Sequence, residues 1–224
     1  MRLVRSILFV AFLLLVAAHA AAGPVGVHPG FKIGMTVANL RGDVASVAEL
    51  ESRADITFGG PLRLDLGPYF SLQPELQYVP TGGTGTLLVD NGGTPASVEG
   101  ALKLDYLELP LLAKFRLPGS PSMMPNLYLG PTAALNLASK LTGDLTAAGG
   151  SASGEADLKN QMESLLLGGA IGGGFDLKMG KGLLTFDARY SKSFSDMFKA
   201  ASSGVLSGGD PRSNSVTVTA GYSF

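Results

Sequence analysis

The sequence contains no cysteine and no tryptophan, and it has few charged residues. Without cysteine, the chain forms no disulfide scaffold, thiolate zinc site, iron–sulfur cluster or cysteine nucleophile. Only two histidines occur, His19 and His28, which leaves little material for imidazole catalysis or a multi-histidine metal site. The formal net charge is −1, so the chain lacks the basic field that holds nucleic acid. We therefore expect no cofactor, no metal and no nucleic-acid partner.

Apolar residues and glycine, in contrast, are abundant. Apolar residues make up 46% of the 224 residues and charged residues only 16%, whereas soluble domains are usually about 25% charged. Glycine occurs 31 times, which is roughly twice its average usage. This composition is unusual for a water-soluble protein and is more typical of a protein whose outer surface faces lipid.

The first 22 residues have the pattern of a cleavable secretory signal. Arg2 and Arg5 form a positive start, and an apolar run follows over residues 7–18. This run is shorter than the roughly 20 residues that a membrane-spanning helix needs. The pattern therefore favours a cleaved signal peptide over an uncleaved membrane anchor.

Two cleavage positions fit the small-residue pattern, after Ala20 and after Ala22, and both stay open. We predict a signal peptide over residues 1–22 and a single domain over residues 23–224. No other stretch approaches 18 consecutive apolar residues. An exported apolar chain of this kind is either a soluble β-rich protein or a closed barrel in a membrane, because only helices and closed barrels satisfy every backbone group in lipid.

Hydrophobicity along the rest of the chain alternates with a period of two, as it does in β-strands. In the segment 183–191, apolar residues at even positions alternate with polar residues from Thr185 onwards. Eight segments fit this pattern, namely residues 31–38, 55–66, 70–78, 107–116, 126–137, 165–178, 183–191 and 215–224. We therefore predict eight antiparallel strands.

Long and short connections alternate between these segments. The long ones span about residues 41–54, 81–100, 139–164 and 194–214, and the short ones span residues 67–69, 118–125 and 179–182. Outer-membrane barrels alternate long external loops with short periplasmic turns in this way. The predicted fold is all-β: an eight-stranded antiparallel up-and-down transmembrane β-barrel in the bacterial outer membrane. Its even strand number places both termini in the periplasm and all four long loops outside.

Several segments resemble a known family. They are FSLQPELQY (70–78), DYLELPLLAKF (105–115), LYLGP (127–131), GGGFDL (172–177), FDARYS (186–191) and the terminal GYSF. Together they are similar to the outer-membrane β-barrel domain family, often called porin-like or PorT-like, of Bacteroidetes-type bacteria. The resemblance covers residues 31–224 and implies an eight-stranded outer-membrane barrel without one assigned activity. One branch of the family supports protein secretion across the outer membrane, and nothing in this sequence selects that branch.

The two faces of the predicted strands differ in chemistry. The apolar face is expected to meet outer-membrane lipid, and aromatic residues are placed to form interfacial girdles: Tyr69, Tyr78, Phe115, Phe186, Tyr190, Phe194, Tyr222 and Phe224. The lumen face carries six basic and five acidic residues, which are Lys32, Arg63, Asp65, Glu75, Glu108, Lys114, Arg116, Asp176, Lys178, Asp187 and Arg189.

The near balance of these lumen charges predicts an internal salt-bridge network. An eight-stranded barrel is only wide enough for its own side chains, and charges in such a space have to pair. The alternative is an ion-selective pore, which favours a ring of charges of one sign. Glycines at 168, 169, 172, 173 and 174 provide room for curvature or for large lumen side chains. Their spacing fits neither a dinucleotide-binding motif nor a phosphate-binding loop.

The sequence does not predict an enzyme. His28, the only histidine after the signal, precedes the first strand and is expected to be a solvated terminal residue. Glu75 and Glu108 lie on adjacent predicted strands and are candidates for a carboxylate pair that cleaves glycosides. We favour the simpler interpretation that these two glutamates pair with Lys114 or Arg189 in the lumen.

The last strand has the pattern of an assembly signal. Val218, Ala220, Tyr222 and Phe224 alternate with small or polar residues and end on an aromatic residue. Outer-membrane barrels commonly end in this way, and the barrel-assembly machinery reads the pattern. The alternative is that an edge strand simply ends in phenylalanine.

Two of the long loops are candidates for contact with an extracellular partner, although plain solvated loops fit equally well. They are residues 81–100, rich in glycine and threonine, and residues 139–164, whose segment GEADLKNQMES is a candidate short helix. We predict an integral outer-membrane barrel with a filled lumen and a structural or surface-interaction role. The alternatives are a small-solute porin, a component of a transport or secretion system, and a soluble barrel that binds an apolar ligand.

Overall fold

A computed structural model describes residues 26–41, 51–91, 94–120, 122–147, 150–196 and 212–224. The predicted signal peptide at 1–22 lies outside these residues, as do most of the connections expected at 41–54 and 194–214. Within the described ranges, no helix is both long and apolar enough to span a membrane.

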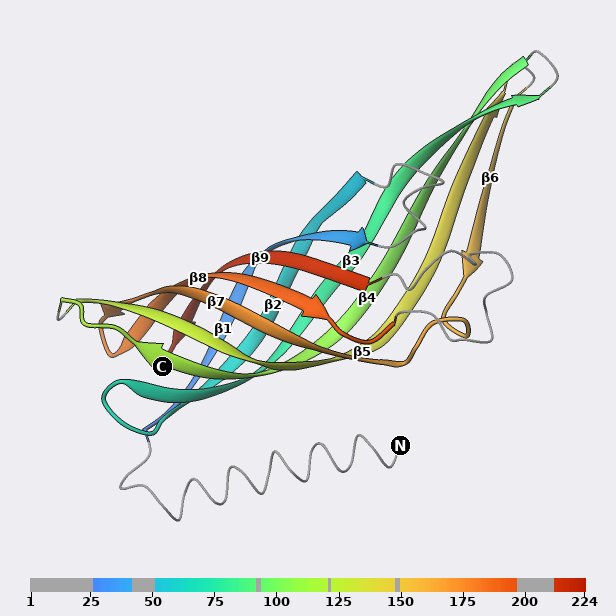
Figure 1. Cartoon of the computed structure of the whole chain (residues 1–224). Coiled ribbons are helices and arrows are strands. Elements are labelled where there is room, and N and C mark those ends of the chain that lie inside the picture. Colours follow the sequence, from blue (N-terminus) through green and yellow to red (C-terminus); the bar gives the residue numbers. More distant parts are fainter. Residues whose placement is uncertain (1–25, 42–50, 92–93, 121, 148–149, 197–211) are drawn as a thin grey trace.

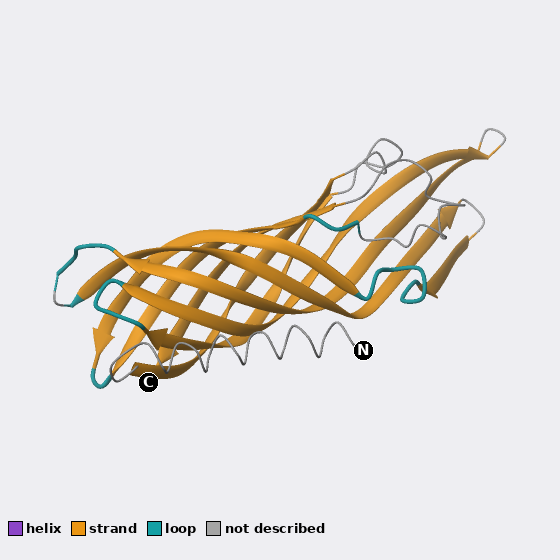
Figure 2. Cartoon of the chain, turned by 60° about the horizontal axis from the view of Figure 1, so that its bottom comes forward, coloured by secondary structure: helices purple, strands orange, loops and turns teal. Residues whose placement is uncertain are grey.

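Nine strands make up the regular structure of the described chain. They are β1 (Gly26–Arg41), β2 (Glu51–Asp65), β3 (Phe70–Asn91), β4 (Thr94–Arg116), β5 (Met123–Ala147), β6 (Gly150–Asp157), β7 (Leu165–Met179), β8 (Gly182–Ser193) and β9 (Arg212–Ser223). All strands except β6 form a closed antiparallel barrel in the order β1-β2-β3-β4-β5-β7-β8-β9, and β9 pairs back onto β1 (Figure 1). The strands run obliquely around the barrel (Figure 2), as closure requires. The predicted eight-stranded barrel is confirmed.

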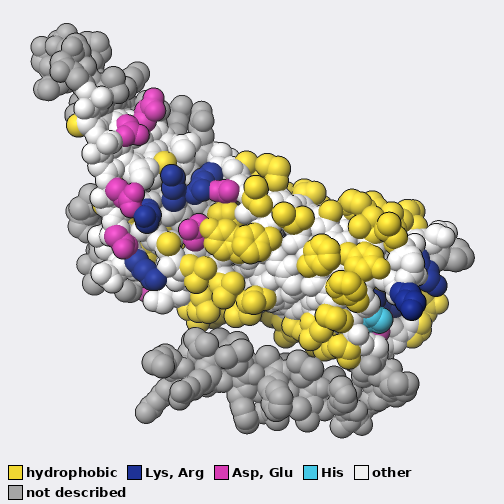
Figure 3. All heavy atoms as spheres, turned by 180° about the vertical axis from the view of Figure 1, so that it is seen from behind, with side chains coloured by type: hydrophobic (Ala, Val, Ile, Leu, Met, Phe, Trp, Pro, Cys, Tyr) yellow, Lys and Arg dark blue, Asp and Glu magenta, His cyan; other side chains and the backbone are white. Residues whose placement is uncertain are grey.

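The two faces of the barrel wall are inverted relative to those of a soluble protein. Ile33, Ile171 and Val218 point outward and are 56%, 59% and 58% exposed, whereas Lys32 and Asp187 are buried inside. On the face seen in Figure 3, hydrophobic side chains cover the middle of the barrel, and charged side chains gather toward its two ends. Each strand thus presents apolar side chains to lipid, while pairing with its neighbours satisfies the backbone.

The short connections join the strands as predicted, at the end of the barrel where β1 begins and β9 ends. At the first turn, the Leu66 N–H donates to the Phe70 carbonyl. At the tightest turn, between β7 and β8, Gly180 has a φ of +63°, a conformation that a residue without Cβ adopts freely. Aromatic pairs near this end include Phe175 with Phe186, whose ring centroids lie 5.1 Å apart.

The regions expected to be long loops at 81–100 and 139–164 are instead largely strands. β3 and β4 continue as a hairpin to the pair Asn91–Thr94, and β5 is extended far enough to pair with β6. These extensions form a four-stranded sheet, β3-β4-β5-β6, that projects beyond the barrel (Figure 1). The loop prediction was wrong because it took glycine-rich and threonine-rich segments without regular alternation as irregular, whereas pairing between neighbouring backbones holds them in a sheet.

The short helix expected in GEADLKNQMES is also absent from the described chain. Its first four residues, Gly154–Asp157, belong to β6, because the extended β5 offers them a free row of backbone partners. The next residues form a turn in which the N–H groups of Gln161 and Met162 donate to the Leu158 carbonyl.

Candidate functional site in the barrel lumen

The barrel order determines which walls of the lumen face each other. Three strands separate β3 from β8 in either direction around the barrel, and three likewise separate β2 from β7. Members of each pair therefore lie on opposite walls. Side chains that bond between β3 and β8, or between β2 and β7, cross the full width of the lumen.

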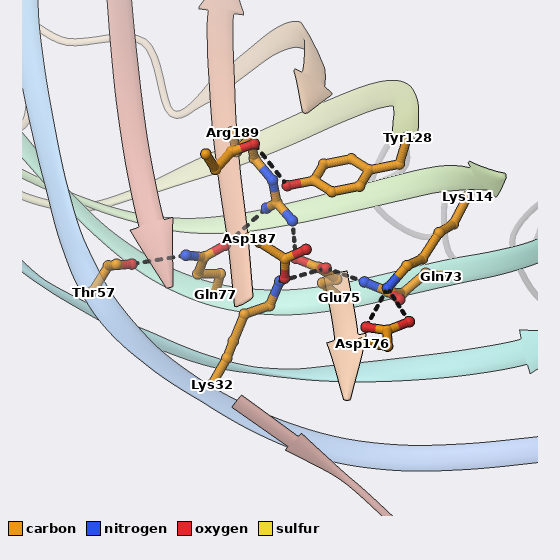
Figure 4. Close-up of polar contacts among 11 residues, drawn as sticks. Lys32, Thr57, Gln73, Glu75, Gln77, Lys114, Tyr128, Asp176, Asp187 and Arg189 are labelled. Atoms are coloured by element: carbon orange, nitrogen blue, oxygen red, sulfur yellow. Dashed lines mark hydrogen bonds and ion pairs between the residues drawn. The ribbon is translucent and has the colours of Figure 1, made fainter. Parts of the chain in front are cut away.

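Glu75 on β3 is the centre of the first polar cluster (Figure 4). Its Oε1 accepts hydrogen bonds from Lys32 Nζ and Gln73 Nε2, both at 2.7 Å. Its Oε2 accepts one from Arg189 Nη2 on β8, also at 2.7 Å. Lys32 Nζ lies 3.7 Å from an oxygen of Asp187 as well. The Arg189–Glu75 pair thus links opposite walls of the lumen. A hydrogen bond between two charged groups of this kind is stronger than one between neutral groups.

Uncharged side chains hold the Arg189 guanidinium in place. Its Nη1 donates to Gln77 Oε1 at 2.9 Å, and the Gln77 amide in turn donates to the Thr57 hydroxyl at 2.9 Å. The guanidinium carbon lies 5.4 Å from the centre of the Tyr128 ring (Figure 4), which is within range of a cation–π contact. The Tyr128 hydroxyl donates to the Ala188 carbonyl at 3.3 Å. Arg189 is therefore held by groups on β3 and β5, and Gln77 connects it further to Thr57 on β2.

Gly172 on β7 makes room for Tyr128. A Cβ atom at this position would lie 2.6 Å from the Tyr128 hydroxyl oxygen and would also collide with the Ala188 carbonyl. This contact matches one of the two roles predicted for the glycine cluster, namely space for a large lumen side chain.

A second polar cluster lies nearer the short turns. Lys114 Nζ on β4 is 3.1 Å from Asp176 on β7, and Arg63 on β2 is 3.8 Å from the same carboxylate across the lumen. Arg63 also pairs with Asp65 at 3.2 Å, and Arg116 donates to Asp65 as well. Of the two partners predicted for the glutamates, Arg189 therefore pairs with Glu75, whereas Lys114 pairs with Asp176.

Three predicted residues occupy positions that differ from expectation. Lys178, expected in the lumen, is exposed, because β7 reaches the rim of the barrel there. Glu108 is buried in the lumen but has no ion pair among the described residues, so it does not join the predicted network. His28 is not a freely solvated residue: its Nε2 lies 3.5 Å from Asp65, and its Nδ1 is 2.8 Å from the Phe224 backbone oxygen. Closure of the barrel between β1 and β9 brings His28 to the last residue.

The remaining charged residues predicted for the network take part in the two clusters. The sequence argument overlooked the uncharged members, which are Thr57, Gln73, Gln77 and Tyr128. Strand alternation places all four on the inner face, so the same pattern that selected the charges also identifies them.

The outer half of the lumen, toward the long connections, is built differently. Leu104, Tyr106, Met162 and Leu166 form a buried apolar cluster, and Met162 reaches it from the turn that follows β6. A cavity of about 50 Å³ lies beside this cluster. Within the described residues, no group of three or more histidine or acidic side chains is arranged to hold a metal ion.

A family model described as the outer membrane protein beta-barrel domain matches residues 23–199. This chain belongs to the outer membrane protein beta-barrel domain family. As a member of that family it is an outer-membrane β-barrel protein, and its apolar outer surface is embedded in the lipid of that membrane. No curated protein matches the sequence.

Several solved structures of outer-membrane proteins are similar to this member of the family. The attachment invasion locus protein Ail of Yersinia pestis is 15% identical, with 88% of this chain and 98% of that chain covered and a TM-score of 0.40. OprG of Pseudomonas aeruginosa is 15% identical, with 91% and 96% covered and a TM-score of 0.45. Neisserial surface protein A is 10% identical, with 88% and 97% covered and a TM-score of 0.42.

Proposed function

We propose that this barrel is a non-conducting anchor in the outer membrane that presents the β3–β6 sheet to an extracellular partner. The observation that carries the proposal is the pair of ties across the lumen, Arg189 to Glu75 and Arg63 to Asp176. Together with Tyr128, these side chains occupy the space through which a solute would pass. The mixed signs of the charges also differ from the single-sign ring of a selective pore.

Recordings from planar lipid bilayers test the closed lumen. The purified protein is expected to give no stable conductance, and a Lys140→Ala variant, changed only on the projecting sheet, should be equally silent. Large, stable conductance from the unmodified protein would defeat this proposal and favour the small-solute porin.

The projecting sheet supports the surface role. Residues 151–157 of β6 are all exposed, and Lys140 pairs with Glu155 on its surface at 2.7 Å. Both ends of the described barrel chain lie at the side of the short turns, so we propose that this side faces the periplasm and that the sheet lies outside. Export through a signal peptide at 1–22 is part of the same proposal.

Because the chain lacks cysteine, single introduced thiols report this orientation directly. We expect a membrane-impermeant maleimide to label Ser153→Cys, on β6, in intact cells. Lys181→Cys, at the turn between β7 and β8, should be labelled only after the cells are broken. The reverse pattern would invert the proposed orientation.

We propose no catalytic role for the lumen carboxylates. Both oxygens of Glu75 are held by basic side chains, so Glu75 does not form with Glu108 the free carboxylate pair that glycoside cleavage needs. A place in the secretion-associated, PorT-like branch of Bacteroidetes-type barrels rests on the sequence resemblance alone and stays a prediction.

We also propose that Val218, Ala220, Tyr222 and Phe224 are read by the barrel-assembly machinery. Val218 and Phe224 are exposed on the outer face at 58% and 63%, where a binding partner can reach them. Deletion of Phe224 should lower the amount of folded, heat-modifiable protein in outer membranes several-fold, whereas Phe224→Tyr should not.

Phe224 also has a structural contact, because its N–H donates to the Pro29 carbonyl. Refolding in detergent, where no assembly machinery is present, distinguishes recognition of Phe224 by that machinery from this structural role. If deletion of Phe224 acts through the assembly machinery, the purified variant will still refold in detergent. Failure to refold there would assign Phe224 a purely structural role.

A further inference from the structure

The cavity in the outer half of the lumen is lined by a carboxylate that forms no salt bridge within the described residues. Glu108 lines this cavity and is only 8% exposed, and its Oε1 accepts no hydrogen bond from the part of the chain that the structure describes. The other fully buried lumen carboxylates, Glu75, Asp176 and Asp187, each lie within 3.7 Å of a lysine or arginine nitrogen. A buried carboxylate without a direct cationic partner is costly to ionise, so a cationic ligand that fits the cavity would be bound favourably beside it.

The basic residues that act most strongly on Glu108 are already bonded to another carboxylate. They are Arg189 and Lys32, which both donate to Glu75. Arg189 already donates to Glu75 and Gln77. Lys192 lies at the wall of the cavity, but it is exposed and alternates with the inward-facing Ser191. In the described chain, Glu108 therefore has no lysine or arginine nitrogen within ion-pair distance.

The walls of the cavity indicate what kind of cation fits. Val79, Ala134 and Leu166 provide an apolar side, and Thr132, Ser191 and Ser215 provide hydroxyl groups. Calcium takes six to eight oxygen ligands, whereas an ammonium group is satisfied by three acceptors. The volume of about 50 Å³ admits a few non-hydrogen atoms, given that one water needs roughly 10–15 Å³ on this measure.

We propose that this cavity binds a small protonated amine. The ammonium group donates to Glu108 Oε1 and to neighbouring hydroxyls, and the short alkyl chain packs against Val79, Ala134 and Leu166. The turn that carries Met162 forms part of the adjoining apolar cluster, which shares Tyr106 and Leu166 with the cavity. The site lies outward of the Glu75–Arg189 tie, so it is a closed-ended pocket and does not require a conducting lumen.

Calorimetric titration of the full protein in a nonionic detergent, with ethylammonium chloride as the probe, tests the proposal. A ligand of three non-hydrogen atoms is expected to bind with a Kd on the order of 1 mM at best. Glu108→Gln preserves the shape of the side chain and should weaken binding at least tenfold. Glu155→Gln, which removes an exposed carboxylate on β6, should leave the affinity unchanged.

Titration with sodium chloride at the same concentrations tests whether any small cation binds in place of the amine. Equal heats from sodium and ethylammonium, or equal affinity of Glu108→Gln and the unmodified protein, would overturn the proposal. Ala134→Leu supplies an independent variant, because it fills the cavity and keeps the carboxylate. It should also abolish binding while leaving heat-modifiable mobility intact, and unchanged binding by this variant would count equally against the site.

Discussion

The half of the lumen near the short turns and the half near the long connections are filled by different chemistry. Near the turns and across the middle, charged side chains pair between opposite walls, as Arg189 does with Glu75 and Arg63 with Asp176. Toward the long connections, an apolar cluster closes over a small cavity, and Glu108 has no ion-pair partner in the described chain.

This difference predicts that the two halves of the lumen differ in rigidity. Buried charges that pair across the lumen connect distant strands, so the inner half opens only if several bonds break together. In the outer half, Leu104, Tyr106 and Leu166 from β4 and β7 pack with Met162, which comes from a turn outside the barrel strands. Local opening is therefore expected first in the outer half, where a ligand could enter.

The largest expected effect is the loss of the central carboxylate. Glu75→Ala leaves Lys32 and Arg189 buried without their shared partner, which should destabilise the barrel by about 3–5 kcal/mol. Urea unfolding in lipid vesicles, followed by heat-modifiable gel mobility, measures this change. Glu155→Ala, which removes an exposed carboxylate, is the control and should leave the unfolding midpoint where it is.

If Glu75→Ala destabilises the barrel no more than Glu155→Ala does, the two halves of the lumen do not differ in the way described above. That result would mean that the ties across the lumen contribute little to stability and that the inner half is no more rigid than the outer half.

The next effect concerns the outer half. Met162 is completely buried, so Met162→Ala should remove about 2 kcal/mol of packing free energy, the low end for such a truncation, because the turn relaxes into the space. Hydrogen exchange should accelerate in residues 158–166 and stay slow around Glu75. Met35→Ala, on the lipid face, is the control. Acceleration that spreads equally to β3 would show that the two halves open as one unit.

A smaller effect is expected where a glycine makes room for a lumen side chain. Gly172→Ala would force Tyr128 and the Ala188 backbone apart and should cost about 1–3 kcal/mol, the usual range for overpacking. Gly154→Ala is the matched control, because a Cβ at Gly154 on β6 meets no atom within 4 Å. Equal stability of the two variants would show that Tyr128 is free to move and does not fix Arg189.

Strand alternation made much of this fold predictable. The faces of β8, with Phe186 outward and Asp187 inward, follow from the sequence alone because lipid and lumen demand opposite chemistry. The outer strand of the projecting sheet, β6, was missed for the same reason: residues 151–157 are exposed on both faces, and hydrophobicity then carries no alternating signal. The first residues of β6, which are glycine, serine and alanine, are therefore indistinguishable from a loop.

The ion-pair partners inside the lumen were less predictable than the positions of the charges. The glutamates were expected to pair with Lys114 or Arg189; Arg189 pairs with Glu75, but Lys114 lies against Asp176. Which side chains meet across a barrel depends on the stagger of the strands as the sheet closes, and that stagger is not visible in any one strand. Charge counting alone therefore assigned Glu108 a partner, whereas its position on β4 leaves it facing the cavity.

The smallest expected effect concerns the exposed pair on the projecting sheet. Lys140 and Glu155 lie 2.7 Å apart, the same separation as Lys32 and Glu75 inside the barrel. Water competes for the exposed pair, and salt screens it. Lys140→Ala should therefore leave the unfolding midpoint unchanged at low and at high salt, whereas Lys32→Ala should lower it at both. A clear, salt-sensitive loss from Lys140→Ala would mean that the sheet is coupled to the barrel and that burial is not what makes the lumen pairs strong.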